Sequence, residues 1–586
     1  MILRNEYPRP QMVRDSFINL NGEWDFEFDD NNVGHKEKWF LNHKFSKKIN
    51  VPFAFESKLS GICDTNYHDH IWYKKVFNID ENLEKKCVLA NFLGVDYYSE
   101  IYINGFLVKT HYGASGSFSA NLTPYLNKGE NVIVVYCYDP GKDISIPRGK
   151  QDWEKESHGI WYTRTSGIYK PVFIEIINEK HVNRFFISTK LKDYEIEITL
   201  ENSFNKGKVN FEINNQRDVL NFEFNIEKDN QTYNLKLPND FVNDRIWRPE
   251  WPFLYDLKIK VYDENNNLVD DIKSYFGIRE IKTKDTRVYL NEHEIYQKLL
   301  LNQGYYPDGI LTAPSVKDME KDILMMKEMG FNGCRIHQKV EEPYFLYLCD
   351  KLGFYVWQEI GACYGYNSFN PRRITNEWID IIKDNYNHPS IIAYTPFNES
   401  WGIEGVPYSK KIQAHVMSLY YLIKSLDDTR LVISNDGWEH CITDLLTCHN
   451  YSHGNKDQTD LYKHFCETLK SRENILKYEG IGRFIINPGF KDCNEPILLT
   501  EFGGVAFKKD TDGKGKAWGY TVSNDSKEFI NDLKRIYKAI EESSCIRGIC
   551  YTQFSDVEQE VNGLLTYDRK YKVDPKIIKE INDTLK

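Results

Sequence analysis

The chain has 586 residues, which is enough for three or four domains of ordinary size. Its 41% hydrophobic and 27% charged residues are typical of a globular protein, and its net charge of −11 argues against a nucleic-acid partner, because such binding needs a basic face. No apolar run approaches the roughly 20 residues of a membrane span, and the N-terminus lacks a basic stretch followed by an apolar one, so we expect no membrane partner.

Twelve cysteines are scattered along the chain without C-x-x-C or zinc-ligand spacing. This favours reduced core thiols in a cytoplasmic protein over a disulfide framework. No Gly-rich phosphate loop is evident, and no ligand cluster indicates a metal, so the sequence predicts neither cofactor nor metal. The oligomeric state is left open, with a homo-oligomer among the possibilities. The 14% aromatic content suits a carbohydrate substrate, since sugar sites favour aromatic platforms.

Residues 1–178 consist of short apolar or alternating runs separated by Gly, Asn and Pro, a pattern typical of an all-β sandwich or jelly roll. Within them, Asn104-Gly105 suits the type I′ turn of a hairpin. Residues 179–280 contain polar-alternating strands such as YEIEITLEN and YDLKIKVYD. Their length and pattern predict a smaller immunoglobulin-like sandwich.

From residue 281 to residue 586 the pattern changes to alternating strands and helices, which predicts a C-terminal (β/α)₈ TIM barrel. Ser315 with Asp318 starts one helix, which ends at Gly330, and Ile412–Leu426 has helical apolar spacing. A helix after the fifth strand is hard to find. The eight predicted strands are Ile295–Leu301, Gly333–Ile336, Tyr355–Glu359, Ile391–Glu399, Leu431–Asn435, Leu445–Tyr451, Pro496–Glu501 and Ile546–Phe554.

Two of these strands run from apolar residues into a carboxylate. IIAYTPFNESWG reaches Asn398 and Glu399, and PILLTEFGG reaches Glu501 before two glycines. The reacting groups of a barrel lie at the C-terminal ends of its strands. Two such carboxylates are what a glycosidase needs, one as acid/base and one as nucleophile.

Five longer segments make the chain resemble glycoside hydrolase family 2, the family of β-galactosidases, β-glucuronidases and β-mannosidases. The similarity covers nearly the full length and the same order of jelly roll, immunoglobulin-like sandwich and barrel. The segments are RTSGIYKPVFIE (164–175), FNGCR (331–335), LCDKLGFYVWQE (348–359), HPSIIAYTPFNES (388–400) and LLTEFGG (498–504).

The resemblance implies roles for residues at the strand ends. Glu399 takes the position of the acid/base and Glu501 that of the nucleophile. Asn398 matches the residue that hydrogen-bonds the sugar's 2-hydroxyl, and Arg335 matches an arginine that keeps the nucleophile ionised. Tyr451 matches a tyrosine that contacts the nucleophile, with His449 and Asn450 beside it.

Other residues are candidates for contact with the substrate, and each also has a purely structural alternative. Glu359 contacts substrate or forms a structural ion pair, and His337 bonds a sugar hydroxyl or a neighbour. Trp401 is the better candidate for stacking on sugar, while Trp357 suits the barrel wall. Glu558 and Glu560 line the pocket or are solvated.

The groups that would read the sugar depart from the family pattern. Trp161 stands where relatives often place an aspartate that reaches the sugar's outer hydroxyls. The Asn-x-Lys motif of β-glucuronidases is absent from the segment DVEQEVNGLLTYDRK. Lys339 is the obvious cation near the second strand's mouth, although a solvated lysine is favoured there.

By family resemblance, the predicted activity is that of a retaining exo-β-glycosidase on a terminal β-galactoside. A β-hexuronidase, for glucuronides or galacturonides, is the alternative within the family. A non-catalytic carbohydrate-binding protein is the alternative from another class, because a fold does not guarantee an activity. In the enzyme hypothesis we expect Glu399 to be protonated at rest, its pKa raised by burial and by the charge of Glu501.

Overall fold

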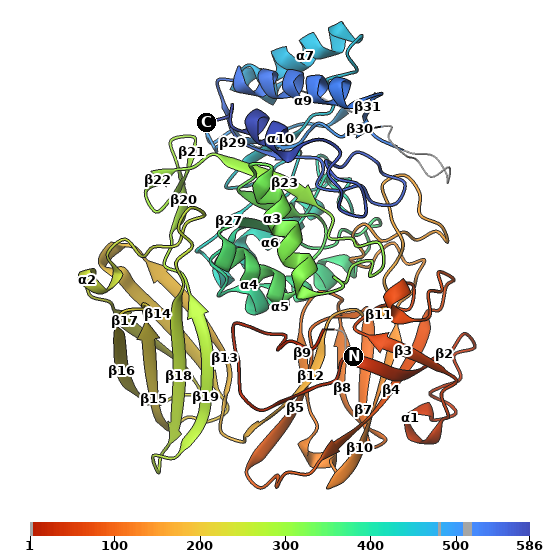
Figure 1. Ribbon diagram of the computed structural model, residues 1–586, viewed down its shortest axis with the longest axis vertical. Helices are drawn as coiled ribbons and strands as arrows, with labels where there is room; N and C mark the ends of the chain where they lie inside the picture. Colours follow the sequence, from red (N-terminus) through yellow and green to blue (C-terminus); the bar gives the residue numbers. More distant parts are fainter. Residues whose placement is uncertain (1–3, 479–481, 508–517) are drawn as a thin grey trace.

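The computed structural model describes residues 4–478, 482–507 and 518–586 (Figure 1). It contains two β-sandwiches and a barrel, in the chain order that the sequence predicts. The described helices include none that is long and apolar enough to cross a membrane. All twelve cysteines lie among the described residues and carry free thiols.

The first sandwich packs a four-stranded sheet, in the order β1-β12-β5-β9, against a six-stranded sheet, in the order β3-β2-β4-β10-β7-β8. Asn104 and Gly105 join β7 to β8 with φ values of 49° and 86°, and Ile103 pairs with Phe106, so the predicted two-residue turn with two positive φ angles forms. The elements of this part are β1 (Phe17–Asn19), β2 (Gly22–Phe28), α1 (Trp39–Asn42), β3 (Lys47–Val51), β4 (His70–Ile79), β5 (Lys86–Phe92), β6 (Val95–Asp96), β7 (Tyr98–Ile103), β8 (Phe106–Tyr112), β9 (Phe118–Asn121), β10 (Gly129–Tyr138), β11 (Gly167–Ile168) and β12 (Val172–Asn178).

The second sandwich is smaller and packs the sheets β13-β14-β17 and β16-β15-β18-β19. In β14 the side chains of Ile196, Ile198 and Leu200 are buried, while Glu197 and Thr199 between them are only partly buried, so the alternation of the sequence sets the inner face. The elements are β13 (Val182–Lys190), β14 (Glu195–Asn202), β15 (Gly207–Asn214), β16 (Val219–Ile226), β17 (Asn230–Lys236), α2 (Asn239–Val242), β18 (Tyr255–Asp263) and β19 (Leu268–Phe276). A short meander of β20 (Ile281–Lys284), β21 (Arg287–Leu290) and β22 (His293–Glu294) leads on to the barrel.

The barrel is a curled sheet of eight parallel strands in the order β27-β26-β25-β24-β23-β32-β29-β28. The predicted fold class is confirmed. The strands are β23 (Gln297–Asn302), β24 (Gly333–Ile336), β25 (Tyr355–Glu359), β26 (Ile391–Thr395), β27 (Leu431–Val432), β28 (Leu446–His449), β29 (Ile497–Glu501) and β32 (Ile546–Tyr551), and a separate pair is formed by β30 (Val505–Phe507) and β31 (Thr521–Ser523).

Helices surround most of these strands. Ser315 caps α3 by accepting a hydrogen bond from the amide of Asp318, as predicted. Between β27 and β28 the described chain has no helix, which is why none was evident in the sequence. The helices are α3 (Val316–Glu328), α4 (Pro343–Leu352), α5 (Asn370–Asn385), α6 (Lys410–Leu426), α7 (Thr459–Leu469), α8 (Arg472–Leu476), α9 (Ser526–Glu541) and α10 (Pro575–Asn582).

A long loop of the first sandwich, residues 139–166, runs between β10 and β11 and reaches the mouth of the barrel (Figure 1). The backbone amides of Arg148 and Gly149 donate to the carbonyl of Ala362 at 3.1 and 3.0 Å. At its other end, the side-chain amide of Gln559 donates to the carbonyl of Trp161 at 2.8 Å. We call this segment the 139–166 loop. It makes the barrel mouth a surface shared by two domains.

Candidate active site

The predicted site residues from the barrel lie together at the C-terminal ends of its strands. Glu501 is the last residue of β29, and Glu399 follows β26 by four residues in a turn with a φ of 52°. Parallel strands present their C-terminal ends at one mouth of a barrel. The others gathered there are Arg335 of β24, His337, Glu359 of β25, Asn398, Trp401, His449 of β28 and Tyr451.

Arg335 is the fully buried centre of this group. Its Nη1 lies 3.0 Å from Oε1 of Glu501 and 2.8 Å from Oδ2 of Asp436. Its Nη2 donates to Oδ1 of Asn398 at 2.7 Å, and its Nε pairs with Glu359. Glu359 therefore forms the structural ion pair that the sequence analysis gave as the alternative to substrate contact. One guanidinium thus fixes the carboxylate expected as nucleophile and the amide expected to bind sugar.

The second oxygen of Glu501 accepts a hydrogen bond from the hydroxyl of Tyr451 at 2.6 Å. Burial and the charge of Glu501 hold the pKa of Tyr451 well above its usual value, so the phenol remains a donor at every physiological pH. One oxygen of the carboxylate is therefore hydrogen-bonded by the phenol, and the other is ion-paired with the guanidinium without accepting a hydrogen bond. These two contacts orient the carboxylate of Glu501.

Glu399 lies nearer to solvent, with 17% of its side chain exposed. Its Oε1 is 2.8 Å from Nδ1 of His449, and its Oε2 accepts from the indole of Trp401 at 3.3 Å. The other ring nitrogen of His449 lies 3.0 Å from Oδ2 of Asp436. Asp436, His449 and Glu399 thus form a hydrogen-bonded chain that reaches from the buried Arg335 to the barrel mouth.

The hydrogen bonds of Glu399 and His449 correct the expectation that Glu399 is protonated at rest. Burial raises the pKa of the Glu399 carboxyl, but the hydrogen bond and charge of His449 outweigh burial and lower it. Burial alone would lower the pKa of His449, whereas Glu501, Asp436 and Glu399 together raise it to about 10. The resting proton therefore sits on the imidazole, and the sequence pattern missed this because it depends on a contact across the barrel.

His337 follows β24 and lies close to Asn398 and Glu501. Its Nδ1 contacts Oε1 of Gln303 at 2.9 Å, and its Nε2 lies 3.2 Å from Nδ2 of Asn398 and 3.7 Å from Oε1 of Glu501. Burial holds the pKa of His337 well below its usual value, so the ring is neutral. A neutral imidazole beside Glu501 can donate one hydrogen bond and accept another, but it carries no extra proton to transfer.

Trp161, from the 139–166 loop, lies beside Trp401 with ring centroids 5.9 Å apart. Trp153 and Tyr364 complete an aromatic cluster, at 4.7 Å from Trp161 and 5.2 Å from Trp401. Because Trp401 bonds the carboxyl expected as acid/base, this cluster lies beside Glu399. Trp357, by contrast, is buried in the barrel wall, as expected.

Three charged side chains are less exposed than the solvated alternatives considered from the sequence. Lys339 is not solvated: it is buried, 2.8 Å from Oε1 of Glu341, and donates to the carbonyl of Gly304 at 2.9 Å. Glu560 is buried, bonded by the hydroxyl of Tyr162 and by the amide of Asn562 at 3.0 Å. Glu558 accepts from the backbone amide of Thr163 at 3.1 Å. The contacts of Glu560 with Tyr162 and of Glu558 with Thr163 join the two domains, whereas those of Lys339 lie within the barrel.

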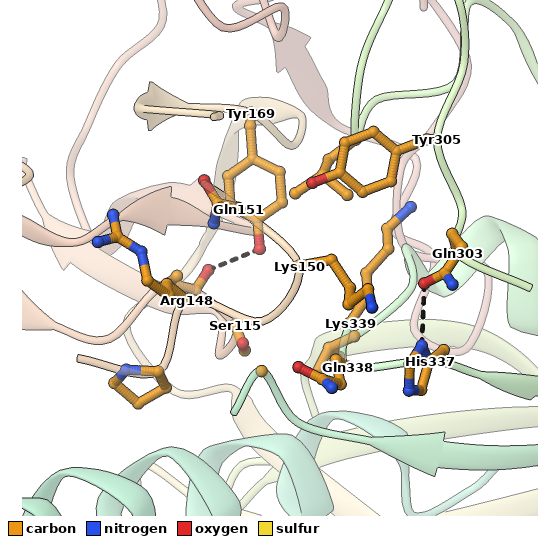
Figure 2. Close-up of a pocket in the computed structure, with 15 residues that line it drawn as sticks. Ser115, Arg148, Lys150, Gln151, Tyr169, Gln303, Tyr305, His337, Gln338 and Lys339 are labelled. Carbon is orange, nitrogen blue, oxygen red and sulfur yellow. Dashed lines mark hydrogen bonds between the residues drawn. The ribbon is translucent and has the colours of Figure 1, made fainter. Parts of the chain in front are cut away.

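A pocket lies between the 139–166 loop and the barrel (Figure 2). Figure 2 shows Arg148, Lys150 and Gln151 on the side of the loop and Gln303, His337 and Lys339 on the side of the barrel. Sequence reasoning missed Lys150 and Asp436. Asp436 follows the fifth strand, which is a usable signal, whereas a lysine in a loop of another domain carries none.

Among the described residues, Glu399, His449 and Glu501 are the group whose donor atoms lie close enough for a metal ion, all within 4.8 Å of one another. The short contact between His449 and Glu399 already occupies two of these atoms. The protonated imidazole of His449 thus supplies a positive charge next to the carboxylates of Glu399 and Glu501.

Three family models match consecutive parts of the chain. The sugar binding domain of glycosyl hydrolases family 2 matches residues 17–175, a second model described as glycosyl hydrolases family 2 matches residues 180–279, and the TIM barrel domain of that family matches residues 281–586. Together they account for nearly the whole chain.

Relatives and solved structures carry names of more than one activity. A beta-galactosidase of Thermoanaerobacter pseudethanolicus is 27% identical over 398 residues, which are 65% of this chain and 50% of the relative. A putative beta-glucuronidase of Formosa agariphila is 28% identical over 534 residues, 85% of this chain and 63% of the relative. This chain therefore spans about half to two thirds of the length of these curated relatives.

The structure of a GH2 beta-galacturonidase from Eisenbergiella tayi bound to glycerol superposes with a TM-score of 0.74 at 20% identity, covering 100% of this chain and 99% of the other. A β-glucuronidase from Ruminococcus gnavus in complex with D-glucuronic acid gives a TM-score of 0.79 at 17% identity, covering 99% of each chain. At these identities the superpositions establish the fold.

Proposed function

Because the chain belongs to glycosyl hydrolase family 2, we propose that it is a retaining exo-β-glycosidase that removes a terminal non-reducing β-linked sugar. One observation carries the proposal: a carboxylate oxygen of Glu399 and one of Glu501 lie within 4.8 Å of each other. Retaining glycosidases place their carboxyl groups about 5–5.5 Å apart, whereas inverting ones leave about 6.5–9.5 Å for a water. The spacing supports direct attack by a carboxylate.

In the first step Glu501 attacks the anomeric carbon, and the bond to the leaving oxygen breaks. That oxygen takes the proton shared by Glu399 and His449, which leaves a glycosyl ester on Glu501. In the second step Glu399 accepts a proton from water, the water oxygen bonds to the anomeric carbon, and Glu501 departs as a carboxylate. Arg335 and Tyr451 remain bonded to Glu501 and stabilise the charge that it regains.

The test uses two variants that must differ in kind. Glu501→Ala cannot form the ester and is expected to be almost inactive on every substrate. Glu399→Ala should still release activated aryl groups, which need no proton, and azide should then replace water and yield a β-glycosyl azide. An α-azide, or release of the product with inverted configuration in an NMR time course, would contradict the proposed roles.

The other class of function, a non-catalytic carbohydrate-binding protein, is separated by the same assay. If the wild-type chain releases nitrophenol from none of a panel of β-glycosides but binds sugars, the enzyme proposal is wrong. Two glycones are candidates for the panel. The name of the Thermoanaerobacter relative supports a β-galactoside, and the buried cation Lys150 at the barrel mouth favours a β-hexuronide.

A further inference from the structure

Lys150 belongs to the first sandwich, yet its side chain lies at the barrel mouth with only 6% exposed. It lines the pocket of Figure 2 with Gln303, His337 and Lys339. Its ammonium is 5.6 Å from the ring centroid of Tyr162. His337, on the same pocket, lies 3.7 Å from the carboxylate of the proposed nucleophile. The lysine therefore lines the same pocket as a side chain that lies close to the proposed nucleophile.

The backbone around Lys150 is fixed in this position. Gly149 has a φ of 62°, and a Cβ there would lie 2.3 Å from the carbonyl oxygen of Gln338, so only glycine permits this close approach to the barrel. On the other side, the carbonyl of Lys150 accepts from the amide of Tyr162 at 2.8 Å. The loop thus delivers the lysine to a defined place rather than leaving it to solvent.

The charge of Lys150 has no direct partner. Among the described residues no carboxylate lies within 4.0 Å of its ammonium, whereas the neighbouring Lys339 is paired with Glu341 at 2.8 Å. Burial lowers the pKa of Lys150, and the carboxylates of Glu560, Glu501 and Glu399 around it counteract that effect. A buried ammonium with unused donors is unfavourable unless a ligand supplies the acceptors.

We propose that Lys150 selects the sugar by binding the carboxylate of a β-linked hexuronide held at the non-reducing end. This inference rests on the proposed function and adds the substrate class to it. The cavity beside Lys150 has a volume of about 30 Å³, which is room for about two waters and so for a carboxylate rather than a sugar ring. A carboxylate there would accept charge-assisted hydrogen bonds that a hydroxymethyl group cannot match.

The experiment compares the wild-type chain, Lys150→Met and Lys155→Met on nitrophenyl β-D-glucuronide, β-D-galacturonide and β-D-galactoside. Lys155 is an exposed lysine of the same loop and serves as the matched control. We expect the wild type to prefer one of the two uronides. Lys150→Met should lower kcat/KM for that uronide about 100-fold, because an uncompensated carboxylate is then buried, and change the galactoside value less than about threefold. Lys155→Met should behave as wild type.

A second measurement separates sugar recognition from an electrostatic effect on the reacting carboxylates. Free D-glucuronate and D-galacturonate are tested as competitive inhibitors, and Lys150→Met should weaken the better one about as strongly as it lowers kcat/KM. Equal losses on uronide and galactoside, in a variant with an unchanged melting temperature, would overturn the inference. So would a wild-type chain that cleaves only the galactoside, an outcome that leaves the proposed function standing. Cleavage of no glycoside would instead refute the proposed function itself.

Discussion

In the proposed mechanism, Glu399 delivers a proton that it shares with His449. Replacing His449 by glutamine removes the imidazole but leaves the Glu399 carboxyl in place. In the wild type, the imidazole bonds Glu399 at 2.8 Å and Asp436 at 3.0 Å. The state with the proton on His449 and the state with the proton on Glu399 contain the same number of protons. The pair therefore acts as one acid, and its extra proton is held with the pKa of about 10 that the surrounding carboxylates give His449.

The size of the effect follows from the hydrogen bond that changes. A glutamine still bonds Glu399 but carries no charge. A hydrogen bond to a charged partner contributes about 1.5–3 kcal/mol and a neutral one about 0.5–1.5 kcal/mol, so roughly 1–1.5 kcal/mol is lost. This corresponds to a shift of about one pH unit in the alkaline limb of kcat/KM, toward lower pH, for substrates whose leaving group needs protonation.

The assay is a pH profile of kcat/KM for an alkyl glycoside and for a dinitrophenyl glycoside of the preferred sugar. Loss of the imidazole leaves the extra proton on Glu399 alone, so the alkaline limb for the alkyl substrate should move to lower pH. The dinitrophenyl profile should change little. His464→Gln, on the exposed face of α7, is the control for histidine loss. An unmoved alkaline limb, or an equal fall for both leaving groups, would refute the shared-proton reasoning.

Three further variants probe other parts of the structure. Tyr451→Phe removes the donor at 2.6 Å from Glu501 and should lower kcat by about 10- to 150-fold, measured on an aryl substrate, with KM changed far less. Trp153→Ala should raise KM for aryl glycosides about 2- to 10-fold. The inhibition constants of methyl glycosides should stay unchanged. Arg279→Ala removes the donors to two buried carbonyls and one partly buried carbonyl between the second sandwich and the barrel, and should lower the free energy of unfolding in urea by about 3 kcal/mol or more. An unchanged urea midpoint would contradict the last expectation.

The barrel was predictable because its strands are buried on both faces and read as apolar runs. Gly333–Ile336 and Tyr355–Glu359 have the predicted bounds. The strand predicted for Ile391–Glu399 ends at Thr395, because the polar residues beyond it leave the ladder and Glu399 adopts a φ of 52°. Apolar pattern thus places a strand well, but its polar end belongs to the site rather than to the sheet.

The site was predictable in proportion to how closely its residues follow those strands. Glu399 and Glu501 follow or end apolar runs and were evident, and Tyr451 came from the family resemblance. The direction of the pKa shift of Glu399 could not be predicted, because it is set by His449, which is close in space but distant in sequence. Lys150 was also missed, because a lysine in a loop is usually solvated and only the fold shows this one buried.

The division of the site between two domains separates chemistry from recognition. The groups proposed to react or to position the reacting atoms lie at the C-terminal ends of barrel strands or a few residues beyond them, and the parallel sheet fixes where those strands end. Lys150 and Trp161 arrive on the 139–166 loop, which is bound to the barrel through the carbonyl of Ala362 and the side chain of Gln559. A change in this loop alters what is bound without moving Glu399 relative to Glu501, so it should act on KM and on the choice of sugar more than on the rate of the chemical step.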